Sequence, residues 1–170
     1  HDNDVLHGSF MQDGLYALKH GRFDIVLKLI FNEILRKPAW RNMSQIMDIE
    51  DEYDIRSTFF WLVNQGKHNG INNADYDINN EAIQQLIAEI DDRGWVNGLH
   101  KSTSDESYSD EMNKLTTQVS ANRNHFLRIN LPSTFEQIES AGVTLDCSVG
   151  FAEKIGFRTG YALPIQPFNM

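Results

Sequence analysis

The hydrophobic positions along the chain follow two different periods. Residues 56–63 read RSTFFWLV, a continuous β-prone apolar run typical of a strand buried on both faces of a parallel sheet. Residues 23–37 read FDIVLKLIFNEILRK, where apolar positions three and four apart predict a helix that Pro38 stops. Comparable patterns predict helices at 43–53, 81–93, 105–122 and 133–141, and strands at 95–99, 125–129 and 143–146. This alternation of strands and helices favours an α/β domain with a parallel sheet.

Polar stretches separate the predicted elements. Residues 1–4, 8–14 and 66–80 are predicted to be loops, because they are rich in Asn, Asp and Gly. Asn80 is suited to cap the helix that begins at Glu81, and Ser104 or Ser107 to cap the next one.

Length and net charge indicate how many domains the chain forms and which partners are disfavoured. The 170 residues predict one domain, and 15 Lys+Arg against 24 Asp+Glu give a net charge of −9. This charge disfavours nucleic acids and anionic membranes as partners, and no apolar run approaches the roughly 20 residues of a membrane span. The single cysteine, Cys147, excludes an internal disulfide framework and is compatible with a cytoplasmic location, which we expect. Because His1 follows neither Met nor a signal-like segment, the chain is expected to be truncated at both ends.

Ionisable side chains recur where predicted strands end. In parallel α/β folds the loops at these ends converge and form sites, so the residues are expected to share one pocket. They are Asp2, Asp4, His100, Arg123, His125, Asp146 and Arg158.

Several of these residues suit metal-assisted hydrolysis. Asp2 and Asp4 are two positions apart, so in extended chain their carboxylates point to the same side; one could bind a metal and the other act as general base. His100 could bind a divalent ion. His125 is similar, but Arg123 and Arg128 beside it favour either a neutral ring or a role with anionic substrate groups. The alternatives are an acidic loop that caps the next segment and buried histidines held by backbone hydrogen bonds.

A serine and several aromatic residues offer further candidates for a site. Ser148 is close to Asp146, but no G-x-S-x-G turn surrounds it, which argues against a serine hydrolase. Aromatic residues offer either flat surfaces for sugar rings or core packing. They are Trp61, Trp95, Phe126 and Tyr161.

The ordered segments HDND, STFFW, GLHKS, RNHFL, LDCSVGF and GFRTG resemble the polysaccharide deacetylase family, metal-dependent carbohydrate esterases. The resemblance is closest to a divergent bacterial branch with H-D-x-D at the first motif. It implies a distorted (β/α) barrel, seven-stranded when complete, of which residues 1–170 form one incomplete domain. Residues 8–54 would then be a helical insertion between the first two strands, covering the pocket or contacting a partner.

The resemblance also implies roles. Asp2 matches the catalytic base, Asp4 and His100 match metal ligands, and Arg123 matches the arginine that orients the base. Asp146 and Ser148 fall in the fourth motif, and Arg158 belongs to a stretch that lines the pocket. The usual second metal histidine is replaced by Ser104. His125 is therefore favoured as third ligand or as general acid, with Asp105 as a weaker candidate, around a divalent metal that is expected to be zinc.

The implied activity is that of a hydrolase acting on carbon–nitrogen bonds other than peptide bonds. It would remove N-acetyl groups from amino sugars of a bacterial surface polysaccharide or its precursor, so the expected partner is a carbohydrate. Two alternatives stay open: a non-catalytic glycan-binding or scaffold protein, and a metal-free amidohydrolase acting on a small cyclic amide.

Overall fold

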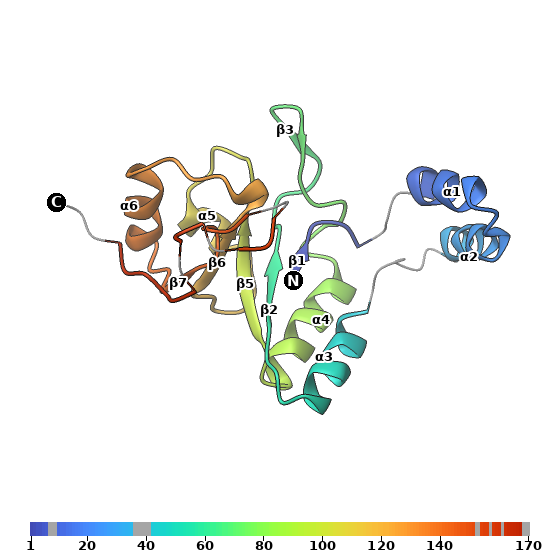
Figure 1. The fold of residues 1–170 in the computed structure, drawn as a ribbon, viewed down its shortest axis with the longest axis horizontal. Helices are drawn as coiled ribbons and strands as arrows, with labels where there is room; N and C mark the ends of the chain where they lie inside the picture. Colours follow the sequence, from blue (N-terminus) through green and yellow to red (C-terminus); the bar gives the residue numbers. More distant parts are fainter. Residues whose placement is uncertain (7–9, 36–41, 152–153, 157, 161, 168–170) are drawn as a thin grey trace.

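A computed structural model describes residues 1–6, 10–35, 42–151, 154–156, 158–160 and 162–167 (Figure 1). A central sheet of parallel strands has the order β1-β2-β5-β6-β7. The strands are β1 (Asp2–Asn3), β2 (Thr58–Trp61), β5 (Val96–Lys101), β6 (Ala121–Asn124) and β7 (Leu145–Asp146). The predicted α/β class and the parallel sheet are confirmed. The sheet is open, and the described residues do not close it into a barrel.

Six helices of the described residues lie between the strands in sequence. They are α1 (Phe10–Lys19), α2 (Phe23–Ile34), α3 (Met43–Glu52), α4 (Glu81–Asp92), α5 (Tyr108–Met112) and α6 (Ser133–Ser140). Of these, α3 and α4 pack against the sheet. The Asn80 side chain accepts a hydrogen bond from the Ala82 backbone N–H at 3.0 Å, so the predicted cap of α4 is confirmed. Ser107, not Ser104, caps α5. None of the described helices combines the length and the apolar character that crossing a membrane requires.

The hydrophobic core lies between the sheet and the helices α3 and α4. Phe59 and Trp61 of β2 are fully buried there, together with Met47 of α3 and Ile90 of α4. Trp61 satisfies its indole N–H inside the core by donating to Asn97 Oδ1 at 2.7 Å. Trp95 is also buried, so both tryptophans pack in the protein; Tyr161 lies outside the described residues.

The predicted strand at 125–129 is wrong by a few residues. Strand β6 ends at Asn124, and residues 125–127 form the short 3-10 turn η1 (His125–Leu127). The segment Ala121–Asn124 is polar, but Asn122 donates to Asn124 Oδ1 at 2.9 Å and to Asp146 Oδ1 at 2.7 Å. Because these partners satisfy the buried side-chain N–H groups of Asn122, tertiary contacts override the low β-propensity of asparagine.

Other boundaries also differ from the predictions. Residues 2–3 form β1 in place of a loop, because backbone pairing with β2 at the sheet edge needs no apolar side chains. Helix α1 occupies much of the predicted loop 8–14, and the helix expected at 105–122 is reduced to α5. The predicted loop 66–80 contains a small antiparallel hairpin of β3 (Lys67–His68) and β4 (Ile71–Asn72).

Candidate metal centre

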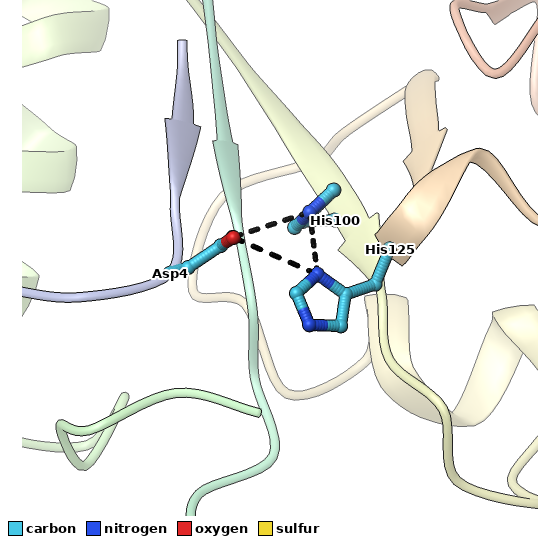
Figure 2. A group of neighbouring side chains, drawn as sticks. All are labelled: Asp4, His100 and His125. Carbon is cyan, nitrogen blue, oxygen red and sulfur yellow. Dashed lines mark hydrogen bonds and ion pairs between the residues drawn. The ribbon is translucent and has the colours of Figure 1, made fainter. Parts of the chain in front are cut away.

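Three potential metal ligands lie at the carboxyl ends of three parallel strands of the sheet. Asp4 follows β1, His100 lies near the end of β5, and His125 begins the turn after β6. Because β5 and β6 are parallel and His100 pairs in register with Arg123, the two histidines lie at the same edge. Figure 2 shows the three side chains pointing toward one another.

The distances between these side chains suit a shared cation. His100 Nε2 lies 3.2 Å from Asp4 Oδ1, and His125 Nδ1 lies 3.1 Å from His100 Nε2. The distance from His125 Nδ1 to Asp4 Oδ2 is 3.6 Å. Ligands bound tetrahedrally to zinc at about 2.0–2.1 Å are about 3.3 Å apart, so the three side chains form a possible metal site.

Hydrogen bonds on the outer side of both rings fix their tautomers. His100 Nδ1 lies 2.6 Å from the Arg123 carbonyl oxygen, and His125 Nε2 lies 3.0 Å from that of Asn72. A carbonyl only accepts, so each of these nitrogens carries the ring proton. The inner nitrogens then present lone pairs to each other and to the Asp4 carboxylate, an arrangement that a cation would stabilise.

The Asp4 carboxylate is partly buried, so a bound cation would stabilise its negative charge. Asp4 Oδ1 is buried and makes no hydrogen bond of good geometry, although His100 lies 3.2 Å away. Burial alone would raise the pKa of Asp4, but the His100 ring and the charges of His100, His125 and Arg123 outweigh it and hold the pKa below its ordinary value. Burial also lowers the pKa of His125, against the opposing effect of Asp4. Both directions favour an ionised Asp4 carboxylate and a neutral His125 ring, and metal binding requires this charge state.

An ion pair lies beside the three ligands. Arg123 Nε donates to Asp2 Oδ2 at 2.9 Å, and Arg123 Nη1 donates to the Cys147 carbonyl at 2.8 Å. Arg123 pairs in register with His100 across β5 and β6, so the Asp2 carboxylate that it binds lies beside the ligands. The guanidinium therefore holds the Asp2 carboxylate near the possible metal site.

Phe126 extends the site to the protein surface. Its side chain is 62% exposed, and its ring centroid lies 4.1 Å from that of His125. Phe126 and Leu127 both have positive φ angles, 57° and 52°, which ordinary side chains rarely adopt. In this turn the His125 ring is buried in the protein, whereas the neighbouring Phe126 ring is exposed to solvent.

Two residues expected in the pocket have other partners. Asp146 accepts hydrogen bonds from Asn122 and from the Ser148 hydroxyl, both at 2.7 Å, and so organises the end of β7. Arg158 is exposed, and its guanidinium lies 3.5 Å from the Leu127 carbonyl. Among the described contacts, neither side chain touches Asp4, His100 or His125.

The two alternative ligand positions also lie elsewhere. Ser104 donates to the buried Glu111 carboxylate at 2.9 Å, and Asp105 has a 92% exposed side chain 3.4 Å from His68 Nε2. Both line a polar hollow of about 520 Å³ whose wall includes Asn73. Of the candidates for the third ligand, only His125 is brought to Asp4 and His100.

Two contributions to the site were not predicted from the sequence. The carbonyl of Asn72 orients His125, and Tyr76 donates its hydroxyl to the carbonyl of Asn3 at 2.7 Å, next to Asp4. Backbone carbonyls carry no side-chain signature, so the sequence offers no signal for Asn72. Tyr76, in contrast, is a buried aromatic in a polar stretch, which marks it as a structural anchor.

Comparisons with protein-family models, with curated proteins and with solved structures found no match for this chain. The functional conclusions therefore depend on the geometry of Asp4, His100 and His125 and on the adjacent Asp2–Arg123 pair.

Proposed function

We propose that the chain is a metal-dependent hydrolase whose divalent ion, zinc by the donor set, is held by Asp4, His100 and His125. One observation supports this most strongly: both histidines donate their outer N–H groups to carbonyls, which leaves their inner lone pairs facing a carboxylate. Two imidazoles and a carboxylate form a ligand set that catalytic zinc uses, with a position left for water or substrate.

The neighbouring residues suit hydrolysis of an amide. A bound divalent ion would polarise the substrate carbonyl and lower the pKa of a coordinated water to about 7. Asp2, oriented by Arg123, is the proposed general base that takes the proton of the attacking water. Once protonated, the same carboxyl can return the proton to the leaving amine. His125 is assigned to metal binding and not to acid catalysis, because both of its ring nitrogens are engaged.

The proposed substrate is an N-acetylated amino sugar of a surface polysaccharide or its precursor. The resemblance of the ordered motifs to polysaccharide deacetylases supports this class. The exposed ring of Phe126 beside His125 adds a surface on which a pyranose ring can stack.

The proposal is tested by measuring metal content and deacetylation on the same preparations. The protein is loaded with zinc, dialysed and analysed for bound metal, and acetate release is followed with N-acetylated chitooligosaccharides. We expect about one zinc per chain in the wild type, loss of metal and of activity in His125→Ala, and retained metal without activity in Asp2→Asn. His20→Ala serves as the control, because His20 is an exposed histidine that contacts the Tyr16 carbonyl.

The outcomes separate the candidate functions. A wild type that binds no divalent metal, or a His125→Ala variant with unchanged metal and activity, would overturn the proposal. A wild type that holds metal and binds the oligosaccharide without releasing acetate would favour the glycan-binding alternative.

A further inference from the structure

Helices α1 and α2 form a hairpin whose outer side is apolar and uncovered. The two helices pack on each other and make only sparse contacts with the other elements. In Figure 1 the hairpin stands apart from the sheet and from α3 and α4. Along one side of α2, Ile25, Val26 and Leu29 are half-buried.

The opposite side of α2 carries an apolar stripe. Its members are Phe23, Leu27, Ile30, Phe31 and Ile34, and each is between 39% and 72% exposed. They recur at i, i+4, i+7, i+8 and i+11, so on an α-helix they lie on one face along its whole length. A spacing of this kind is typical of a helix that packs its face against another helix, and within the described residues no element covers it.

We propose that this stripe, named here the α2 stripe, is the interface through which two copies of the chain form a dimer. A two-fold axis would place the same stripe of each copy against the other, so the two hairpins would meet as a bundle of helices. With roughly 100 Å² exposed per large apolar side chain, the five residues of two copies would bury about 1,000 Å², which is the lower limit for a specific interface before flanking residues are added.

Charge favours a second copy over a membrane. Residues 10–35 contain three acidic and three basic residues, so the hairpin is neutral and the net charge of −9 resides in the remainder of the chain. Contact through the hairpins joins the neutral parts and keeps the acidic parts of two copies apart. A helix that lies on a membrane surface carries several Lys or Arg on its polar face, whereas the described part of α2 has only Lys28.

The test is the mass in solution of the full chain and of matched variants. Light scattering after size exclusion, over a roughly hundredfold dilution series, is expected to give twice the monomer mass of 19.5 kDa for the wild type. Leu27→Glu places a charge at the centre of the α2 stripe and is expected to give the monomer mass throughout. Leu163→Glu is the control, because Leu163 is 71% exposed, as Leu27 is 68% exposed, but lies outside the hairpin.

Ile34→Glu provides a second variant should Leu27→Glu fail to fold, which far-ultraviolet circular dichroism reports. A monomeric wild type at every concentration overturns the proposal, and so does a dimer that survives both hairpin variants. Binding of a monomeric wild type to neutral phosphatidylcholine vesicles, abolished by Leu27→Glu, would assign the α2 stripe to lipid instead. Metal content and deacetylation play no part in this test, so its result is independent of the proposed activity.

Discussion

At the scale of single residues, the turn after β6 places His125 and Phe126 at a cost in backbone energy. Phe126 has φ 57° and ψ 21°, and Leu127 follows with φ 52°. A side chain in this left-handed region costs about 1–2 kcal/mol per residue. The cost is tolerated where the surrounding contacts hold the turn, here the two contacts of the His125 ring with His100 and with the Asn72 carbonyl.

Two substitutions of Phe126 distinguish the backbone strain of the turn from the contacts that the aromatic ring makes. Phe126→Gly is expected to be more stable toward urea than Phe126→Ala by about 1 kcal/mol, because only glycine adopts positive φ without penalty. Both variants should retain metal and lose affinity for the oligosaccharide, since both remove the exposed ring. Equal unfolding free energies of the two variants would show that the turn is not strained.

The sequence predicts the ligands better than it predicts what orients them. Asp4, His100 and His125 are polar side chains beside apolar strands, and parallel strands bring such positions to one edge. The carbonyl of Asn72 reaches His125 only because the hairpin β3–β4 folds over the site. Phe126 lies in the strand predicted at 125–129, but in the structure it has a left-handed conformation that the pattern of apolar residues does not reveal.

At the scale of elements, a buried carboxylate holds the segment that follows His100. Glu111 of α5 is fully buried and accepts hydrogen bonds from Lys101 Nζ at 2.7 Å and from the Ser102 backbone N–H at 2.9 Å. The hydroxyls of Ser102 and Ser104 donate to the same carboxylate. Strand β5 and helix α5 are thus joined by one satisfied polar network.

Removing the negative charge of Glu111 should lower the free energy of unfolding. Glu111→Gln keeps the shape of the side chain but leaves the Lys101 ammonium buried without its counter-ion, so we expect a loss of about 3–5 kcal/mol in urea unfolding. Glu106→Gln is the control, because the Glu106–Lys114 pair is more than one-third exposed on both sides and should cost less than about 1 kcal/mol. Similar losses for the two variants would contradict the assignment of Glu111 as the anchor.

A close approach within the sheet makes Gly98 necessary. A methyl group at this position of β5 would lie 2.7 Å from Phe60 Cδ1 and 3.1 Å from the Ala121 carbonyl oxygen. Gly98→Ala is expected to destabilise the protein by about 1–3 kcal/mol, because the ring of Phe60 must move. Gly14→Ala in α1 meets no atom within 4 Å and should stabilise the helix by about 0.5–1 kcal/mol. Thermal unfolding of the two variants checks these opposite signs.

Elements with a clear hydrophobic pattern could be predicted from the sequence, whereas elements held by polar contacts with residues distant in sequence could not. Strand β2 and helix α4 lie within their predicted ranges because continuous burial and a 3.6-residue period leave little ambiguity. Strand β6 differs from its predicted range because Asn122 and Asn124 form hydrogen bonds with Asp146 and Tyr108, which are distant in sequence. The apolar spacing predicts helix α2 but not what its apolar face contacts, and the structure leaves that face exposed.

At the scale of the whole molecule, burial of two tyrosines links stability to alkaline pH. Tyr108 is buried and donates its hydroxyl to Asn124 Oδ1 at 2.9 Å, and burial raises its pKa to about 12. Burial also raises the pKa of Tyr76 well above its ordinary value; its hydroxyl is bound to the Asn3 carbonyl. Both hydroxyls must stay protonated to donate these hydrogen bonds. Tyr76 contacts the strand β1, at one edge of the sheet, and Tyr108 contacts β6, near the other edge.

The sign of the pH dependence follows from these directions. In the unfolded chain tyrosine ionises near pH 10, so the folded state binds the tyrosine protons more tightly, and the stabilisation is complete below pH 10. It is lost as the pH rises from about 10 through about 12, and Tyr108 alone accounts for about 1–2 kcal/mol after allowance for solvent screening. Urea unfolding at a series of alkaline pH values should show this decline, with a shallower slope for Tyr108→Phe. A slope that Tyr108→Phe leaves unchanged would mean that this hydroxyl does not couple protonation to folding.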